Sequence, residues 1–195
     1  MSEPGAVETF GDFIELGEDR DGEGLILRFS PSSTPLQQRW RNNGLSADFL
    51  AGYVETFMPA DDSDPEALRR RLTVKGAVNF IANELLENAM KYNAEHIGQS
   101  ISMRLHLEKE RILFHQTNAA DATRAAALRD FIARLQTVGA EDLFVRQMES
   151  GGAEEGSGLG LLTMVNDYGA RLAFRLVDGR NGGDSVVTTQ VELDL

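Results

Sequence analysis

The sequence predicts a two-layer α/β fold, in which a mixed β-sheet is covered by helices on one face, and three observations favour it. Two stretches, 101–114 and 171–195, each alternate apolar and polar residues around a turn, which is typical of hairpins. An uninterrupted helical pattern extends from Pro65 to Tyr92. Further helical patterns separate the two hairpins, and this order fits a helix-covered sheet better than a doubly wound parallel sheet.

The composition fits a single domain, with 1–65 as an N-terminal strand and helix extension and 66–195 as the core. Of the 195 residues 42% are hydrophobic, which is enough for one apolar core. A net charge of −12 argues against nucleic acid or an anionic membrane surface as the partner and favours a protein. The lack of cysteine, of a signal-like start and of an apolar run of about 20 residues predicts a cytoplasmic protein.

The N-terminal extension is expected to begin with an irregular acidic leader of about twenty residues, before a strand at 24–30 whose apolar residues alternate. A helical pattern follows at 46–59 and ends at a proline. Its aromatic residues, including Phe49 and Phe57, have a spacing that is more typical of a core than of a partner surface. This helix therefore gives no support for a homodimer, and the question of a homodimer stays open.

The long helix has clear start signals. Ser63 or Asp64 can cap it, and Pro65 occupies its first position. After the first hairpin, a helix is predicted at about 121–136. The stretch 137–160 is rich in Gly and Glu and weak in periodicity, so it is predicted to be a long loop of the kind that forms lids over binding sites.

A short helix is predicted at 161–170, and Gly169 ends it. The second hairpin follows and completes the chain. Histidine metal sites are not expected, because His96, His106 and His115 lack ligand-like spacing.

Polar residues in the middle of the long helix are the first functional signal, in NELLENAMKYN at 83–93. Glu84 and Asn88 lie one turn apart on one face, and Lys91 follows three residues later. A carboxylate can accept a proton, an amide oxygen can bind Mg²⁺, and an ammonium group can meet a phosphate. Spacing alone favours a plainer interpretation, a solvated helix face with an ion pair between Glu87 and Lys91.

A glycine-rich stretch before the last helix is the second signal, EEGSGLGLL at 154–162. Glycines let backbone N–H groups approach an anion, and the helix N-terminus adds partial positive charge. A flexible joint would have the same composition. The stretch lacks the lysine of a P-loop and the preceding strand of a Rossmann motif.

Together, ELLENAMKY and GSGLGLL resemble the N box and the second glycine box of the GHKL superfamily of ATP-binding domains. The resemblance covers about 68–195 and implies a Bergerat-type fold with ATP and Mg²⁺ as cofactors. It implies that Asn88 coordinates Mg²⁺, that Glu84 acts as or assists the general base, and that Lys91 lies near phosphate. It also implies a loop whose glycines wrap the triphosphate through backbone amides, in a segment comprising Gly156, Ser157, Gly158, Leu159 and Gly160.

The sequence departs from the family pattern at the adenine site. The first glycine box, Asp-x-Gly-x-Gly, is missing, and Asn118 stands where its aspartate is expected, followed by two alanines. An Asn oxygen can still accept a hydrogen bond from an adenine amino group, but without the charge of a carboxylate. Thr189 resembles a late threonine of the family that lies beside adenine, but its first interpretation is that of an ordinary strand residue.

Among family members, the chain looks most like bacterial serine/threonine protein kinases that phosphorylate anti-sigma-factor antagonists, particularly the SiaB-like group. No histidine precedes His96, which disfavours histidine autophosphorylation. In this interpretation Glu84 would help to deprotonate a Ser or Thr hydroxyl of a protein partner. Two alternatives stay open: a protein-binding module with a degenerate adenine site, and an unrelated α/β domain in which Glu84 lies far from Gly158.

Overall fold

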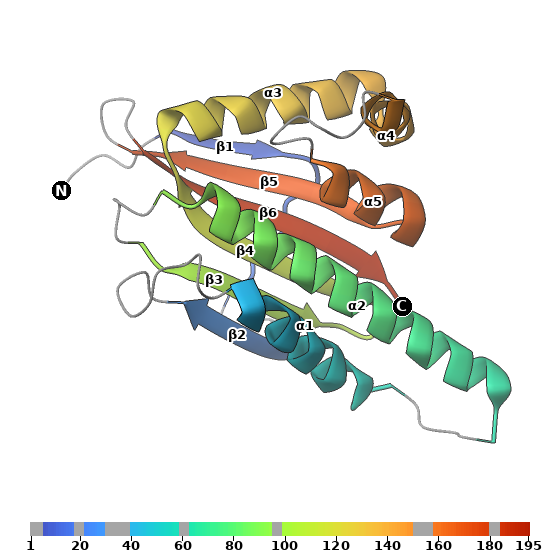
Figure 1. Cartoon of the computed structure of the whole chain (residues 1–195). Helices are drawn as coiled ribbons and strands as arrows, with labels where there is room; N and C mark the ends of the chain where they lie inside the picture. The colour runs from blue at the N-terminus through green and yellow to red at the C-terminus, as the bar shows by residue number, and fades with distance from the viewer. Residues whose placement is uncertain are drawn as a thin grey trace.

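The computed structural model describes residues 6–17, 22–29, 40–58, 63–94, 99–149, 158–179 and 184–195 (Figure 1). Its elements in chain order are β1 (Val7–Phe10), β2 (Glu23–Phe29), α1 (Trp40–Glu55), α2 (Pro65–Tyr92), β3 (Ile101–Leu107), β4 (Arg111–Ala120), α3 (Ala122–Val138), α4 (Ala140–Glu149), α5 (Leu159–Tyr168), β5 (Arg171–Asp178) and β6 (Ser185–Asp194). The strands form one sheet with the order β1-β5-β6-β4-β3-β2.

The sheet is covered by the helices on one face, which confirms the predicted two-layer class (Figure 1). Every described strand pair is antiparallel, whereas the sequence analysis expected a mixed sheet. β4 and β5 do run in the same direction. They are not neighbours, however, because β6 lies between them and pairs with both.

The long helix α2 forms as predicted and crosses the sheet. Asp64 caps it by accepting a hydrogen bond from the Glu66 backbone N–H at 2.9 Å, and Pro65 stands at its first position. One face is buried at helical spacing and contributes to a core shared by the helices and the strands: Val74, Ala77, Val78, Ile81, Ala82, Leu85 and Leu86. Ala89, on the same face, belongs to a separate small cluster with Ile101 of β3. The burial of this face fixes the orientation of the adjoining polar side chains.

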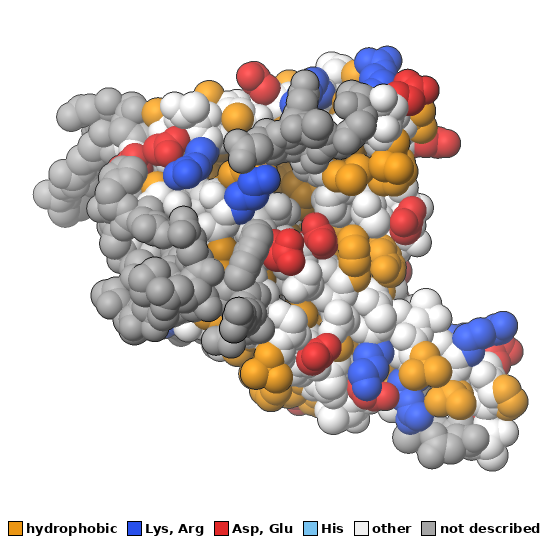
Figure 2. Space-filling view, in the orientation of Figure 1, with side chains coloured by type: hydrophobic (Ala, Val, Ile, Leu, Met, Phe, Trp, Pro, Cys, Tyr) orange, Lys and Arg blue, Asp and Glu red, His pale blue; other side chains and the backbone are white. Residues whose placement is uncertain are grey.

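The helix α1 packs on α2 through small and branched residues, among them Ala47, Leu50 and Val54. The expectation that the aromatic residues of the 46–59 pattern are buried is wrong for Phe49 of α1 and for Phe57 in the turn that follows α1, which are 54% and 45% exposed. Residues at helical spacing occur on two neighbouring faces of α1. The face with Ala47, Leu50 and Val54 packs on α2, and the face with Phe49 is exposed. Apolar side chains consequently reach the surface over α1 and the N-terminal end of α2 (Figure 2).

The N-terminal residues supply strands at both edges of the sheet. Val7–Phe10, expected to belong to an irregular leader, form β1 and pair with β5, while β2 pairs with β3 at the opposite edge. The pattern missed β1 because the strand is four residues long and mostly exposed, so its residues show no apolar alternation.

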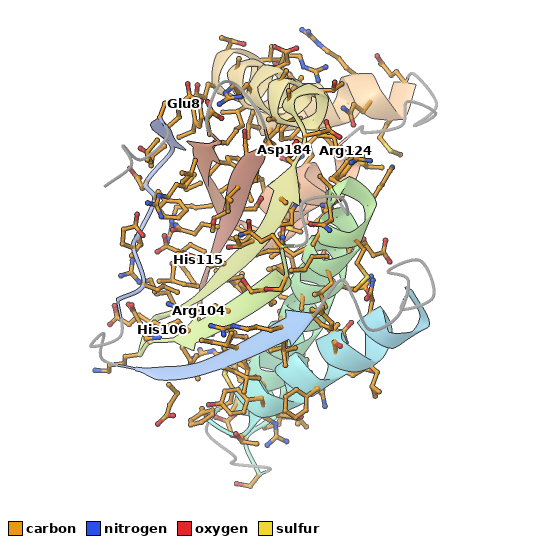
Figure 3. The ribbon with its side chains drawn as sticks, turned by 90° about the vertical axis from the view of Figure 1, so that its left-hand side faces the viewer. Glu8, Arg104, His106, His115, Arg124 and Asp184 are labelled. Atoms are coloured by element: carbon orange, nitrogen blue, oxygen red, sulfur yellow. The ribbon has the colours of Figure 1, made fainter. Side chains whose placement is uncertain are left out.

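Between these strands the chain crosses the sheet face that lies away from the helices (Figure 3). Residues 11–17 are here called the crossing segment. Gln190 of β6 anchors it twice: its Oε1 accepts a hydrogen bond from the Ile14 N–H at 2.7 Å, and its Nε2 donates to the Asp12 carbonyl at 3.1 Å. Arg104 of β3 donates to the Leu16 carbonyl at 2.7 Å. The crossing segment therefore spans several strands.

The predicted loop at 137–160 is wrong in its first part, because Ala140–Glu149 form α4. Gly139, with a φ of 92°, ends α3 and lets the chain turn directly into the next helix. Leu143 is buried in the common core and stabilises this ten-residue helix, whose amphipathic pattern the sequence analysis overlooked within a Gly- and Glu-rich stretch. The rest of the expected lid, 150–157, lies outside the described residues.

None of the helices in the described part of the chain is long and apolar enough to cross a membrane. The described residues also contain no group of three or more His, Asp or Glu side chains arranged to hold a metal ion.

Candidate functional site

A cavity of about 310 Å³ lies between the helical layer and the sheet. This volume is within the range of about 300–1,000 Å³ that is usual for small-molecule sites. Its walls come from α2, α3, the start of α5, β4 and β6. The lining residues are Leu85, Asn88, Tyr92, Gln116, Asn118, Ala120, Arg124, Ala127, Leu128, Phe131, Arg134, Gly158, Leu161, Val187 and Thr189.

Four residues singled out from the sequence meet in this cavity, although the chain separates them widely: Asn88, Asn118, Gly158 and Thr189. The first lies on α2, the second on β4, the third at the start of α5 and the last on β6. The two motif segments therefore lie beside one another in space.

Glu84 lies directly against the glycine-rich segment, because a Cβ added at Gly160 would overlap its Oε2 atom. A side chain at position 160 would therefore displace the Glu84 carboxylate from its place against α5. The half-buried carboxyl has a raised pKa, first because burial disfavours its charged form and second because the charge of Glu87 repels it. Carboxyl groups with raised pKa values beside a pocket are typical of general bases.

Gly158 is required at its position for two reasons. Its backbone is left-handed, with φ 65° and ψ 15°, and an added Cβ would lie 2.5 Å from Cε2 of Phe131. As the residue that precedes α5, it supplies no side-chain cap to the helix, whereas Asp121 caps α3. Among the described residues, no N-cap side chain accepts from the first N–H groups of α5, and such an uncapped N-terminus favours a bound anion.

We expect Gly158→Ala to destabilise the protein more than Gly169→Ala. Gly169 has the same φ of 65° but open space around it, so its replacement introduces only backbone strain of about 1–2 kcal/mol. The alanine at 158 would add overlap with Phe131, by about 1–3 kcal/mol. Urea unfolding of both variants measures the difference, and equal losses would contradict the contact between this glycine and α3.

The floor of the cavity is built from two cross-strand pairs of β4 and β6. Gln116 lies opposite Thr189, and Asn118 opposite Val187. Asn118 is buried, and its Oδ1 accepts a hydrogen bond from Nε2 of Gln116 at 3.0 Å, while its Nδ2 donates to the Ala119 carbonyl at 2.9 Å. The Oδ1 atom retains a second lone pair for a ligand.

Asn88 makes no hydrogen bond to any other described residue, so its amide is available to a ligand. Lys91 is exposed and lies outside the cavity lining, with its Nζ 5.4 Å from the centroid of the Tyr92 ring. Leu159 begins α5 without lining the cavity, and Gly156 and Ser157 lie outside the described residues.

Two cationic residues of the cavity were missed by the sequence analysis, Arg124 and Arg134 of α3. Arg124 is held by Asp121, with Nη1 3.0 Å from Oδ2, and Arg134 is exposed. The signal was present in the sequence, because these arginines share one helical face with Leu128 and Phe131, which also line the cavity.

The fold and site thus define a helix-covered antiparallel sheet with a cavity between its two layers. Among solved structures, a match is a chain of the crystal structure of the SiaB–SiaC complex from Pseudomonas aeruginosa, with 15% identity, a TM-score of 0.55, and coverage of 88% of this chain and 89% of that chain. No protein-family model and no curated protein matches this chain. The similarity shows a shared fold and agrees with the SiaB-like resemblance of the sequence, whereas membership of the GHKL superfamily stays a prediction.

Proposed function

We propose that the chain is a signalling protein that binds Mg–ATP in the cavity between α2, α3 and α5 and transfers phosphate to Ser or Thr of a protein partner. The observation that carries this proposal is the meeting of Asn88, Asn118, Gly158 and Thr189 in one cavity, with Glu84 against Gly160. Four residues that were singled out separately in the sequence thus line one cavity, and Glu84 and Gly160 contact each other on the same two helices, outside the cavity lining.

The cavity suits a nucleotide in its chemistry. Leu128, Phe131 and Val187 offer apolar surface for an adenine ring. Asn118 and Thr189 offer polar atoms at the floor that can hydrogen-bond to the edge of the base.

The phosphates would lie toward the start of α5, because the first backbone N–H groups of a helix favour a bound anion. Arg124 and Arg134 add positive charge to the same cavity. Asn88 would hold Mg²⁺ through its free amide oxygen, since Mg²⁺ is usually bound by one or two protein oxygens together with substrate phosphates and water.

In the proposed reaction, the hydroxyl oxygen of the partner forms a bond to the γ-phosphorus of ATP, the bond from that phosphorus to ADP breaks, and Glu84 accepts the hydroxyl proton. A raised pKa makes Glu84 a stronger base than an exposed carboxylate while it is still ionised. When bound, Mg²⁺ would offset the negative charge of the phosphates. The protein contributes positioning and fixed hydrogen-bond donors.

The proposal of a protein partner rests on the acidic charge of −12 and on the shared fold. The proposal of a cytoplasmic location rests on the lack of cysteine and of a long apolar run in the sequence. The structural neighbour was crystallised as the SiaB–SiaC complex, which is an assembly of two different proteins. The proposed partner of this chain is a phosphorylation substrate that resembles an anti-sigma-factor antagonist.

We expect Mg–ATP to stabilise the protein against thermal unfolding, and excess EDTA to abolish the effect. A ligand at a hundredfold over its Kd adds about 2.7 kcal/mol, equivalent to a rise in Tm of about 5–11 °C for a chain of this size. Because the chain carries a net charge of −12, its field repels free ATP, so binding should depend on the metal. Stabilisation by ATP in EDTA would contradict the assigned role of Mg²⁺.

A second function, that of a protein-binding module without catalysis, is favoured by the hydrogen bonds that the side-chain amide of Asn118 already makes. Its amide already bonds to Gln116 and to the Ala119 carbonyl, and the first glycine box is missing. This function predicts no thermal shift with Mg–ATP and binding of the partner without nucleotide. The same titration therefore distinguishes the two functions.

A further inference from the structure

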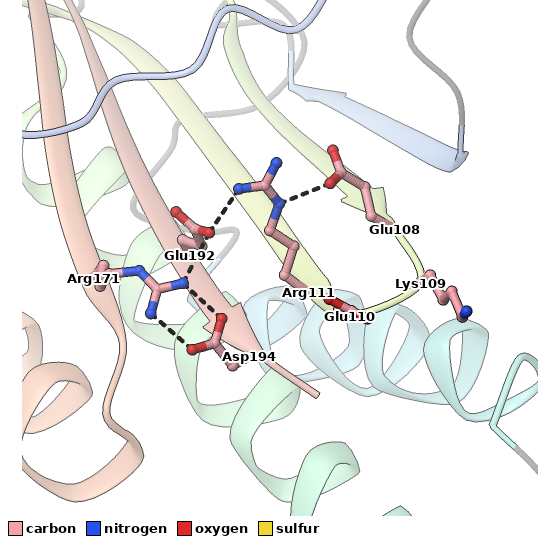
Figure 4. A pocket seen from close by; sticks show the side chains of 7 residues that line it. All are labelled: Glu108, Lys109, Glu110, Arg111, Arg171, Glu192 and Asp194. Carbon is pink, nitrogen blue, oxygen red and sulfur yellow. Dashed lines mark hydrogen bonds and ion pairs between the residues drawn. The ribbon is translucent and has the colours of Figure 1, made fainter.

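The sheet face away from the helices has two unlike ends. At one end the arginines are paired with carboxylates (Figure 4). Arg111 lies 2.7 Å from Glu108 and 2.9 Å from Glu192. Arg171 lies 2.9 Å from Glu192 and 2.6 Å from Asp194. The positive charge at this end is neutralised within the chain.

At the other end, a second cavity of about 170 Å³ lies beside the crossing segment and is here called the far-face pocket. Three strands place an arginine in its lining: Arg28 on β2, Arg104 on β3 and Arg175 on β5. Among the described lining residues Glu15 is the only carboxylate. The far-face pocket is therefore positively charged in a chain whose net charge is −12.

The sheet register places hydroxyl groups between two of these arginines. Directly opposite pairs connect Arg28 to Ser102, Ser102 to Thr117, Thr117 to Thr188 and Thr188 to Arg175. One row across five strands thus consists of three hydroxyl residues with an arginine at each end. The two threonine Oγ1 atoms lie 2.9 Å apart. Hydroxyl and guanidinium groups are the donors that phosphate oxygens accept best in proteins.

The arginines retain donors that the described chain does not use. Arg28 is exposed and forms no hydrogen bond or ion pair with another described residue. Arg104 uses one N–H group to hold the Leu16 carbonyl. Nε of Arg175 is buried and lies 3.4 Å from Oε1 of Glu15 without forming a hydrogen bond. Each guanidinium carries five N–H donors, so most of them are free for a ligand.

We propose that the far-face pocket binds the phosphate group of a small molecule, and that Glu15 competes with this ligand for Arg175. Glu15 is exposed and belongs to the crossing segment, so its carboxylate can leave when a stronger anion enters. The site is separate from the nucleotide cavity, which lies on the opposite face of the sheet, and it stands whether or not ATP is bound there.

Calorimetric titration of the full chain with inorganic phosphate in EDTA tests the proposal. Arg28→Gln and Arg175→Gln should each weaken binding about tenfold, since a charge-assisted hydrogen bond is lost in each. Glu15→Gln should strengthen binding, because the competing carboxylate is removed. A structural defect alone would not weaken phosphate binding in Arg175→Gln and strengthen it in Glu15→Gln.

Arg70→Gln is the matched control, because Arg70 is an exposed arginine of α2 that does not line the far-face pocket, and it should bind phosphate like the unchanged protein. A parallel titration with glucose 6-phosphate shows whether the pocket accepts a phosphate ester or only free phosphate, and either result supports the proposal. The absence of saturable binding to both probes at millimolar concentrations overturns the proposal, and so does phosphate binding by Arg28→Gln and Arg175→Gln that is as tight as that of the unchanged protein.

Discussion

Replacement of Glu84 by glutamine is expected to slow phosphate transfer to a Ser or Thr partner by about 10²–10⁴-fold, the usual contribution of a positioned general base. Glutamine keeps the shape of the side chain against Gly160 but accepts no proton at neutral pH. Binding of Mg–ATP should persist, because the nucleotide is held by other residues. Single-turnover transfer from labelled ATP, measured together with a thermal shift, separates the two effects.

Glu87→Gln is the matched control for this variant. Glu87 follows Glu84 by three residues on α2. It accepts a hydrogen bond from Asn83 and raises the pKa of Glu84 through its charge. Its replacement should preserve transfer and move the acid limb of the pH–rate profile to lower pH. Loss of transfer in Glu87→Gln equal to that in Glu84→Gln would contradict the assignment of Glu84 as the base.

The raised pKa of Glu84 also predicts a dependence of stability on pH. Because the folded state disfavours the ionised carboxyl, its contribution to stability is most favourable below the unfolded pKa, near 4.5, and declines as pH rises through the folded pKa. Glu84→Gln removes this unfavourable ionisation. The variant should therefore gain stability relative to the unchanged protein at neutral pH, and the gain should vanish at about pH 4 in urea unfolding experiments.

Elements with strong local signals could be predicted from the sequence. The helix α2 has a capping aspartate, a proline at its first position and a continuous apolar face, so local preference and core packing agree. The hairpins β3–β4 and β5–β6 show the alternation that burial on one face of a sheet requires. Gly169 ends α5 in the left-handed conformation, as expected of a glycine at that point.

Elements that depend on distant contacts could not be predicted. The strand β1 exists because the edge of β5 pairs with it, and this pairing leaves no periodic pattern in four mostly exposed residues. The crossing segment is held by Gln190 and Arg104, which lie far along the chain. One end of the sheet face away from the helices has arginines neutralised by carboxylates, and the other end has the arginine-rich far-face pocket. This difference arises from the strand register, which the sequence of a single strand does not reveal.

The candidate site was predictable in part, because its members carry local signals of different kinds. Glu84 and Asn88 stand out as polar residues beside a buried helix face, and Gly158 and Gly160 as glycines before an apolar helix. Their meeting in space was inferred from family resemblance. The arginines of α3 were missed because exposed arginines are common on helices, and only the cavity distinguishes them.

Asn88→Ala is expected to weaken Mg–ATP binding by about 100-fold or more, since even residues that only support a metal ligand contribute about 10–100-fold to metal affinity. The side chain lines the cavity and makes no hydrogen bond to another described residue, so its removal leaves no buried partner unsatisfied and should barely change the stability of the free protein. A loss of affinity at unchanged stability is the signature of a ligand-binding role. Thermal shift titrations with Mg–ATP measure both quantities.

Two further variants decide whether the oxygen of Asn88 is the functional atom. Asn88→Asp keeps an oxygen at that position and should retain more Mg–ATP affinity than Asn88→Ala, because carboxylates are also ligands of Mg²⁺. Asn79→Ala removes an amide from the same helix outside the cavity and should bind like the unchanged protein. Equal affinity in Asn88→Ala and Asn79→Ala would show that no metal is held at Asn88, and the proposed phosphate transfer would then lack the ion that neutralises the charge of the phosphates.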